Sequence, residues 1–198
     1  MSATNTVSPP RSLTTMQPFF RELAVNRETA LALTDGLSPA QLSWRPTEAQ
    51  WGLAEICSHL ATITTLYLPA LDDAINTGHT DAAYSDRPFR GSLVTRLLVW
   101  TMEPPVRLRM RSPRALLPTP LQDPLESRRL YRTAQSAFEL RLERAAGLDL
   151  AHVSVRPPTI RRVRFALGTA LALLLAHERR HLWQATVVRR SPSFPAGD

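Results

Sequence analysis

Two histidines four positions apart stand out near the C-terminal end of the sequence. His177 and His181 lie one helical turn apart, on the face formed by the leucines and alanines before them. A third histidine, His59, lies on the apolar stripe of another expected helix. An unpaired buried polar group costs about 1–3 kcal/mol, whereas one divalent cation can satisfy three converging neutral imidazoles. The spacing favours a site for zinc, nickel or iron(II), with separately hydrogen-bonded core histidines as the alternative.

Three further side chains lie beside these histidines and are candidates for catalytic or supporting roles. Glu55 lies one turn before the first histidine, Glu178 directly follows the second, and Gln184 lies one turn after the third. Either glutamate could orient a ligand imidazole or accept a proton, and Gln184 could hydrogen-bond the bound species. The alternative for each glutamate is a solvent-facing helix position, above all for Glu178, which lies off the apolar stripe.

Residues 177–181 read His-Glu-Arg-Arg-His, which also matches the zinc metalloprotease pattern. Such enzymes usually take their third ligand further along the chain, where this sequence offers only Asp198. They also bind peptides along a strand edge, and the sequence shows no convincing alternating strand. We therefore set the peptidase interpretation aside.

Apolar residues at intervals of three and four predict four helices, over residues 16–34, 50–76, 125–146 and 162–189. The fold class is therefore all-α. A long crossover, residues 77–123, separates the second helix from the third, and its prolines prevent a long helix there. Residues 93–100 could form a short helix. The apolar side chains of the crossover favour packing, as a lid or pocket wall, over disorder.

Length and composition indicate the number of domains and the expected location of the protein. The 198 residues, 43% of them hydrophobic, suit one domain, expected over residues 14–190 between loose tails at 1–13 and 191–198. The single cysteine, Cys57, cannot form an internal disulfide and is expected in the core. We find no secretory signal, and the longest apolar run falls short of the ~20 residues that span a bilayer. We expect a cytoplasmic protein without a membrane partner.

The net charge of +7 comes from 24 basic residues, all of them arginine. They are scattered along the chain, apart from one cluster in the crossover, and no nucleic-acid recognition motif accompanies them. We therefore expect a small-molecule substrate rather than a nucleic-acid partner.

Two motifs resemble the DinB-like superfamily of metalloenzymes, and the order of the expected elements agrees with that family. The motifs are Trp51-Gly-Leu-Ala-Glu55-Ile-Cys-Ser-His59, reached through Arg45-Pro46, and His177-Glu-Arg-Arg-His181-Leu-Trp-Gln184. The resemblance implies a four-helix bundle with one long crossover. It also implies a divalent metal held by His59, His177 and His181.

Members of this superfamily include thiol-dependent transferases and isomerases that use bacillithiol or mycothiol. The resemblance therefore implies an S-transferase or a hydrolase-like relative, with a low-molecular-weight thiol as cosubstrate. Three protein ligands leave a metal an open position, where it can activate water or a thiol. Arg107, Arg109 and Arg111 in the crossover could bind the carboxylates of such a thiol, or form an exposed solubilising loop. The competing function is a non-catalytic metal- or ligand-binding bundle, with a homodimer left open.

Overall fold

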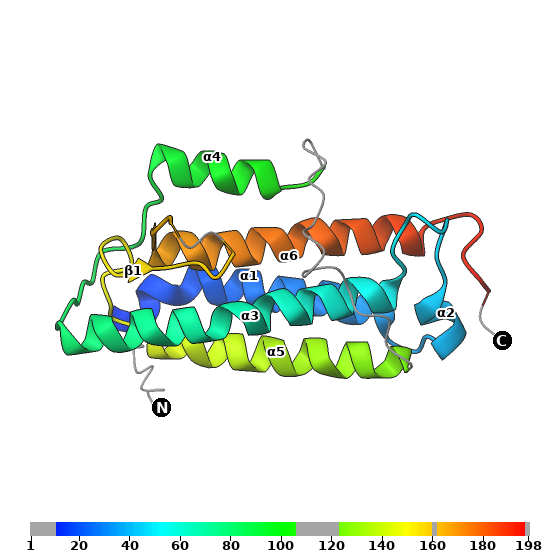
Figure 1. The fold of residues 1–198 in the computed structure, drawn as a ribbon, viewed down its shortest axis with the longest axis horizontal. Coiled ribbons are helices and arrows are strands. Elements are labelled where there is room, and N and C mark those ends of the chain that lie inside the picture. Colours follow the sequence, from blue (N-terminus) through cyan, green and yellow to red (C-terminus); the bar gives the residue numbers. More distant parts are fainter. Residues whose placement is uncertain (1–10, 106–122, 160–161, 197–198) are drawn as a thin grey trace, which may run out of the picture.

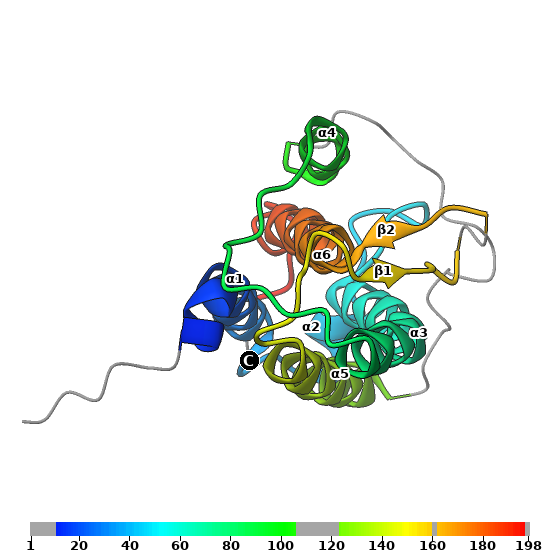
Figure 2. The ribbon, with the colours of Figure 1, turned by 90° about the vertical axis from the view of Figure 1, so that its left-hand side faces the viewer.

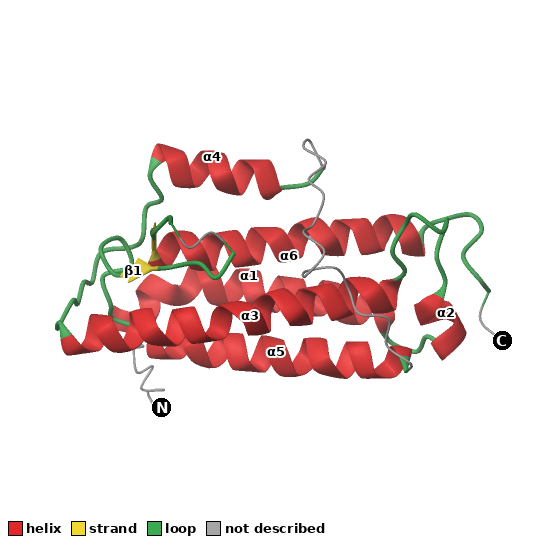
Figure 3. Ribbon diagram, in the orientation of Figure 1, coloured by secondary structure: helices red, strands yellow, loops and turns green. Residues whose placement is uncertain are grey.

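The computed structural model describes residues 11–105, 123–159 and 162–196. Within these residues the chain forms six helices and one two-stranded sheet (Figures 1 and 3). The elements, in chain order, are α1 (Arg11–Thr34), α2 (Pro39–Ser43), α3 (Leu53–Thr80), α4 (Leu93–Met102), α5 (Pro124–Arg144), β1 (Ser154–Val155), β2 (Phe165–Ala166) and α6 (Leu167–Arg189). The expectation of a mostly helical fold is confirmed.

The helices α1, α3, α5 and α6 lie side by side along the long axis of the molecule (Figures 1 and 2). Helix α3 contacts α5 and α6, and α1 contacts the same two helices. The apolar stripes recognised in the sequence meet between them. Fully buried side chains of this core include Leu71 and Ile75 of α3, Leu142 of α5, and Leu171 and Leu175 of α6. Burying side chains of this kind contributes about 1.5–3 kcal/mol each, which favours the side-by-side arrangement.

Helix α3 begins at Leu53 rather than at the predicted residue 50, so Trp51 lies before the helix. The Glu55 carboxylate accepts a hydrogen bond of 3.0 Å from the backbone N–H of Gly52, the N-cap residue. A Cβ at position 52 would lie 2.5 Å from the carbonyl oxygen of Trp44, so only glycine fits this close approach. The helix then continues to Thr80, four residues beyond the predicted end.

Helix α6 begins at Leu167 rather than at the predicted residue 162. Two short strands precede it, so our prediction that the chain has no strand is wrong. Ser154 pairs with Ala166 and Val155 with Phe165, in antiparallel register. Strands of two residues are too short for an alternating pattern to show in a sequence. At the start of α6, a Cβ on Gly168 would lie 2.5 Å from the Phe89 ring, so this glycine lets the connection after α3 pack against the helix.

The short helix predicted at residues 93–100 is present as α4 and extends to Met102. It lies outside α6, as the end-on view shows (Figure 2). Ser92 caps it by accepting a hydrogen bond from the backbone N–H of Thr95. Residues 106–122 of the crossover, which include Arg107, Arg109 and Arg111, lie outside the described residues.

The residues that follow α6 contact α2 and the loop after it. The Gln41 side-chain amide donates a hydrogen bond of 3.1 Å to the carbonyl of Pro195, and Phe194 packs edge-on against Trp44. Phe194 and Pro195, within the expected tail, are thus held against α2 and the loop that follows it. In the part of the chain that the structure describes, no helix is long and apolar enough to cross a bilayer.

Candidate metal centre

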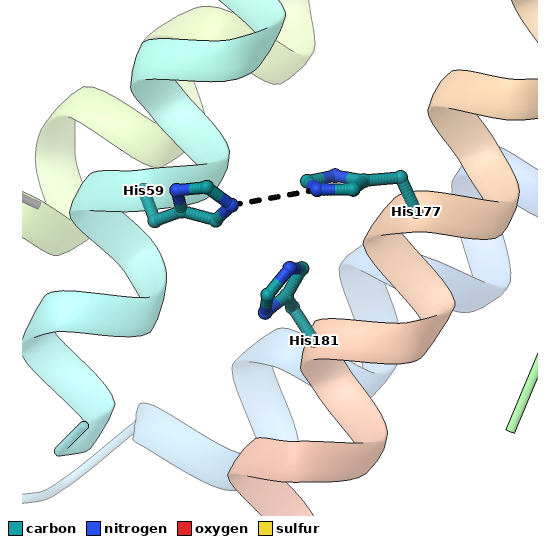
Figure 4. Close-up of side chains that lie close together, drawn as sticks. All are labelled: His59, His177 and His181. Atoms are coloured by element: carbon teal, nitrogen blue, oxygen red, sulfur yellow. Dashed lines mark hydrogen bonds between the residues drawn. The ribbon is translucent and has the colours of Figure 1, made fainter. Parts of the chain in front are cut away.

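Three histidines converge between α3 and α6 (Figure 4). His59 comes from α3, and His177 and His181 come from successive turns of α6. The ligand nitrogens of the three all lie within 4.8 Å of one another, and the two Nε2 atoms of His59 and His177 are 3.4 Å apart. His59 and His181 are buried, whereas His177 is half-buried. The predicted convergence of these three residues is present in the structure.

The spacing of the nitrogens fits a shared ion. At 3.4 Å the His59–His177 contact exceeds the ~2.9–3.0 Å typical of a good nitrogen hydrogen bond. Two imidazole nitrogens bound tetrahedrally to zinc, at about 2.0–2.1 Å each, lie about 3.3–3.4 Å apart. Three neutral imidazoles are also a common donor set for zinc and neighbouring first-row ions. The residues present therefore fit a divalent metal.

The surroundings keep two of the imidazoles uncharged. Burial lowers the pKa of His177 well below its ordinary value, and the neighbouring His181, His59 and Arg180 lower it further. Burial, then His59, lowers the pKa of His181 to about 3. A neutral ring keeps a nitrogen lone pair at neutral pH, which is the form that binds a metal.

Gln184 fixes which nitrogen of His181 carries the proton. Its Oε1 lies 3.0 Å from the Nδ1 of His181, and a carbonyl oxygen only accepts hydrogen bonds. Nδ1 therefore carries the hydrogen, and the lone pair is at Nε2. The sequence-based expectation was a hydrogen bond from Gln184 to the bound species, whereas the structure places this oxygen on the ring of His181.

Glu55 has a structural role at the start of α3. Besides capping the helix, its carboxylate pairs with Arg45 at 2.5 Å. This pair ties the Arg45-Pro46 connector to α3, next to Trp51. The indole of Trp51 lies against two rings of the cluster, with its centroid 4.9 Å from that of His59 and 5.8 Å from that of His181. The motif recognised in the sequence thus builds one wall of the histidine site.

Glu178 is buried, with 4% of its surface exposed, so the solvent-facing interpretation of this residue is wrong. Its carboxylate accepts hydrogen bonds from Asn26 of α1 at 2.8 Å and from Tyr131 of α5 at 2.6 Å. Burial raises its pKa to about 6 against the opposing effect of these two donors. A single apolar stripe does not predict this position, because α6 packs against α1, α3 and α4 and is buried on more than one face.

Asn26 and Tyr131 are residues that sequence reasoning missed. Each is an isolated polar residue on a helix distant in sequence from Glu178, so no spacing within one helix links them to it.

Cys57 is buried as expected, and burial raises the pKa of its thiol to about 12, which disfavours the nucleophilic thiolate. The other two histidines bond elsewhere, His79 to the carbonyl of Arg144 and His152 to Asp149.

A surface groove of about 530 Å³ adjoins the site at the C-terminal end of α6. Trp51 and Gln184, which contact the cluster, also line this groove. Trp183, Val187 and Arg190 form part of its wall. The groove therefore reaches the two residues that support the histidines, on the Nδ1 side of His181.

Comparison with known proteins agrees with this arrangement. The family model of the DinB superfamily matches residues 22–185, a range that includes all three histidines. The protein belongs to the DinB superfamily. Neither a search of curated proteins nor a search of solved structures found a match.

Proposed function

We propose that this protein is a divalent-metal-dependent enzyme whose metal is held by His59, His177 and His181. The observation that carries the proposal is the convergence of three imidazoles with their ligand nitrogens within 4.8 Å of one another. Membership of the DinB superfamily supports it. The long helices would then form the four-helix bundle, with one long crossover, that the resemblance implies.

The reaction that we propose is transfer of a low-molecular-weight thiol to a small electrophilic substrate, with a hydrolase-like reaction as the alternative. A divalent ion at this site would supply a Lewis acid that lowers the pKa of a thiol or a water. Gln184 holds the His181 ring with its Nε2 lone pair available. His177 is the least buried of the three histidines, and we propose that a substrate approaches the cluster from its side.

Other groups shape the surroundings of the reaction. Trp51 covers the His59 and His181 rings and limits the access of water from that side. The Arg45–Glu55 pair holds the connector that carries Trp51. Arg107, Arg109 and Arg111 follow α4 in the sequence, and we propose that they bind the carboxylates of the thiol. A cytoplasmic location suits a reaction that consumes a reduced thiol.

The test is turnover of a thiol with 1-chloro-2,4-dinitrobenzene by protein loaded with zinc, nickel or iron(II). Bacillithiol and mycothiol are the thiols to compare, and a nitrophenyl ester probes the hydrolase alternative. In the thiol reaction a carbon–sulfur bond forms, the carbon–chlorine bond breaks, and chloride and a proton leave. We expect at least a tenfold rate increase over the uncatalysed reaction, lost in His59→Ala and His177→Ala.

The matched control is His152→Ala, which removes an exposed histidine and should keep the wild-type rate. Wild-type protein that binds metal but turns over neither a thiol nor the ester would contradict the enzyme proposal. That outcome would favour the competing function, a non-catalytic metal-binding bundle.

A further inference from the structure

Helix α4 carries four exposed large apolar side chains within eight residues, more than any other segment of that length in the described residues. Leu93 is 80% exposed, Val94 66%, Leu97 59% and Trp100 50%. Thr95 is the one residue of this ten-residue helix that is buried. Contiguous apolar patches of this size on a protein surface commonly mark an interaction site.

Polar contacts hold α4 against α6. The Oγ1 atoms of Thr95 and Thr169 are 2.9 Å apart, and Arg180 donates a hydrogen bond of 3.2 Å to the carbonyl of Thr101. Just after the helix, Glu103 pairs with Arg179. These contacts fix α4 along the outside of α6 (Figure 2) and leave Leu93 and Leu97 exposed. The helix is thus positioned as a rigid surface.

We propose that this face binds the same face of a second copy of the chain, through antiparallel pairing of two α4 helices. Leu93, Leu97 and Trp100 follow one another at intervals of four and three residues. That spacing forms the stripe by which one helix packs against another. Antiparallel pairing about a twofold axis also places the N-terminus of each α4 beside the C-terminus of the other, where the helix dipoles attract.

The exposed apolar area of these side chains is close to the apolar part of a standard interface, provided that the pairing buries all of it. Taking about 175 Å² for each of the four side chains, their exposed fractions amount to roughly 450 Å² of apolar surface. A standard interface buries about 800 Å² per partner, of which roughly 55–65% is apolar, or about 440–520 Å². Helix α4 carries one charged residue, Arg96, so its composition provides no charge pattern that would select a different partner.

The first test measures mass in solution by sedimentation equilibrium over a range of concentrations. The wild type should approach twice the chain mass of 22.1 kDa, and Leu97→Glu should halve the observed mass to that of one chain. The control Leu140→Glu changes a leucine on α5 that is 49% exposed and should leave the wild-type mass unchanged. Circular dichroism of each variant confirms that it is folded.

The second test uses a cysteine at the expected twofold axis. Mild oxidation of Leu97→Cys should link most of the chains as disulfide dimers, whereas Leu140→Cys should not link, and the natural Cys57 is buried. A wild type that stays a single chain at all concentrations, together with an unlinked Leu97→Cys variant, would overturn the proposal. Monomeric protein that sediments with phosphatidylglycerol vesicles through Leu97 would also overturn it, in favour of a lipid surface. Neither test depends on the metal or on catalysis.

Discussion

Gln184 determines how His181 presents its ring, because its carbonyl oxygen accepts the Nδ1 hydrogen. Substituting leucine for Gln184 keeps the size of the side chain and removes this acceptor. We expect metal affinity to fall by about 10–100-fold, the usual effect of losing such a supporting hydrogen bond. Competition with a chelator of known affinity measures the change. The control Gln50→Leu alters the same groove without touching His181, and an equal loss in both variants would contradict the assigned role.

The buried carboxylate of Glu178 depends on the donors that face it. Tyr131→Phe removes the hydroxyl that donates to Glu178 at 2.6 Å and leaves Asn26 as a donor. We expect the free energy of unfolding to fall by about 1–3 kcal/mol, because a buried charge loses a hydrogen bond. Urea unfolding measures this, and Tyr84→Phe, at an exposed tyrosine, should change stability little.

Because the Tyr131 hydroxyl bonds to Glu178 rather than to a histidine, metal content should be unchanged in Tyr131→Phe. Loss of metal without loss of stability would assign Glu178 to the metal site instead.

At the scale of single residues, the sequence predicted the histidines better than it predicted their supports. A stripe of apolar residues that passes through His59, or through His177 and His181, places these rings inside the molecule whatever the details of packing. The burial of Glu178 depends on which helices pack around α6, and the hydrogen bond of Gln184 depends on its rotamer. Neither property is encoded in the spacing within one helix.

Between elements, Asp72 ties α3 to α5. Its carboxylate pairs with Arg141 at 2.7 Å and also with Arg144. The hydrogen bond from Arg141, together with the charges of both arginines, lowers the pKa of Asp72 below its ordinary value, against a smaller effect of burial. Since the folded pKa is lower than the unfolded one, the stabilisation is present above about pH 4 and is lost as the pH falls through the folded pKa.

Asp72→Asn should therefore lower the free energy of unfolding at pH 7, by about 0.5–1 kcal/mol for a partly exposed pair. The difference from the wild type should shrink towards zero as the pH falls through the lowered pKa of Asp72 and the wild-type carboxyl becomes protonated. Unfolding in urea at several pH values checks this. The control is the neighbouring Asp73→Asn, at an exposed position with no ion pair among the described residues, which should change the stability at pH 7 little. A difference for Asp72→Asn that persists in acid would contradict the electrostatic origin.

The ends of the elements were harder to predict than the elements themselves. Helix α3 begins at Leu53 because Gly52 fits against the Trp44 carbonyl and the Glu55 side chain caps the helix. The contact with Trp44 is made outside the helix, so the apolar spacing within the helix does not predict it. Helix α6 begins at Leu167 because β2 pairs with β1 just before it. Long apolar periodicity thus predicts that a helix exists, whereas contacts with other segments decide where it begins.

For the whole molecule, the structure joins two distant parts of the sequence at one point. His59 and His177 are 118 residues apart in sequence, and they meet because α3 and α6 pack side by side. That α3 and α6 are neighbours could be expected from the family resemblance, but not from the periodicity of either helix. Arg107, Arg109 and Arg111 of the crossover lie outside the described residues, and their relation to the site stays a prediction.

The central claim is that His59, His177 and His181 bind one ion together. Its most direct test is elemental analysis by inductively coupled plasma mass spectrometry, after incubation with zinc, nickel or iron(II) and removal of the excess. We predict about one ion per chain in the wild type and in His152→Ala, and almost none in His59→Ala or His177→Ala. A wild type without metal, or full retention of metal in His59→Ala, would contradict the claim.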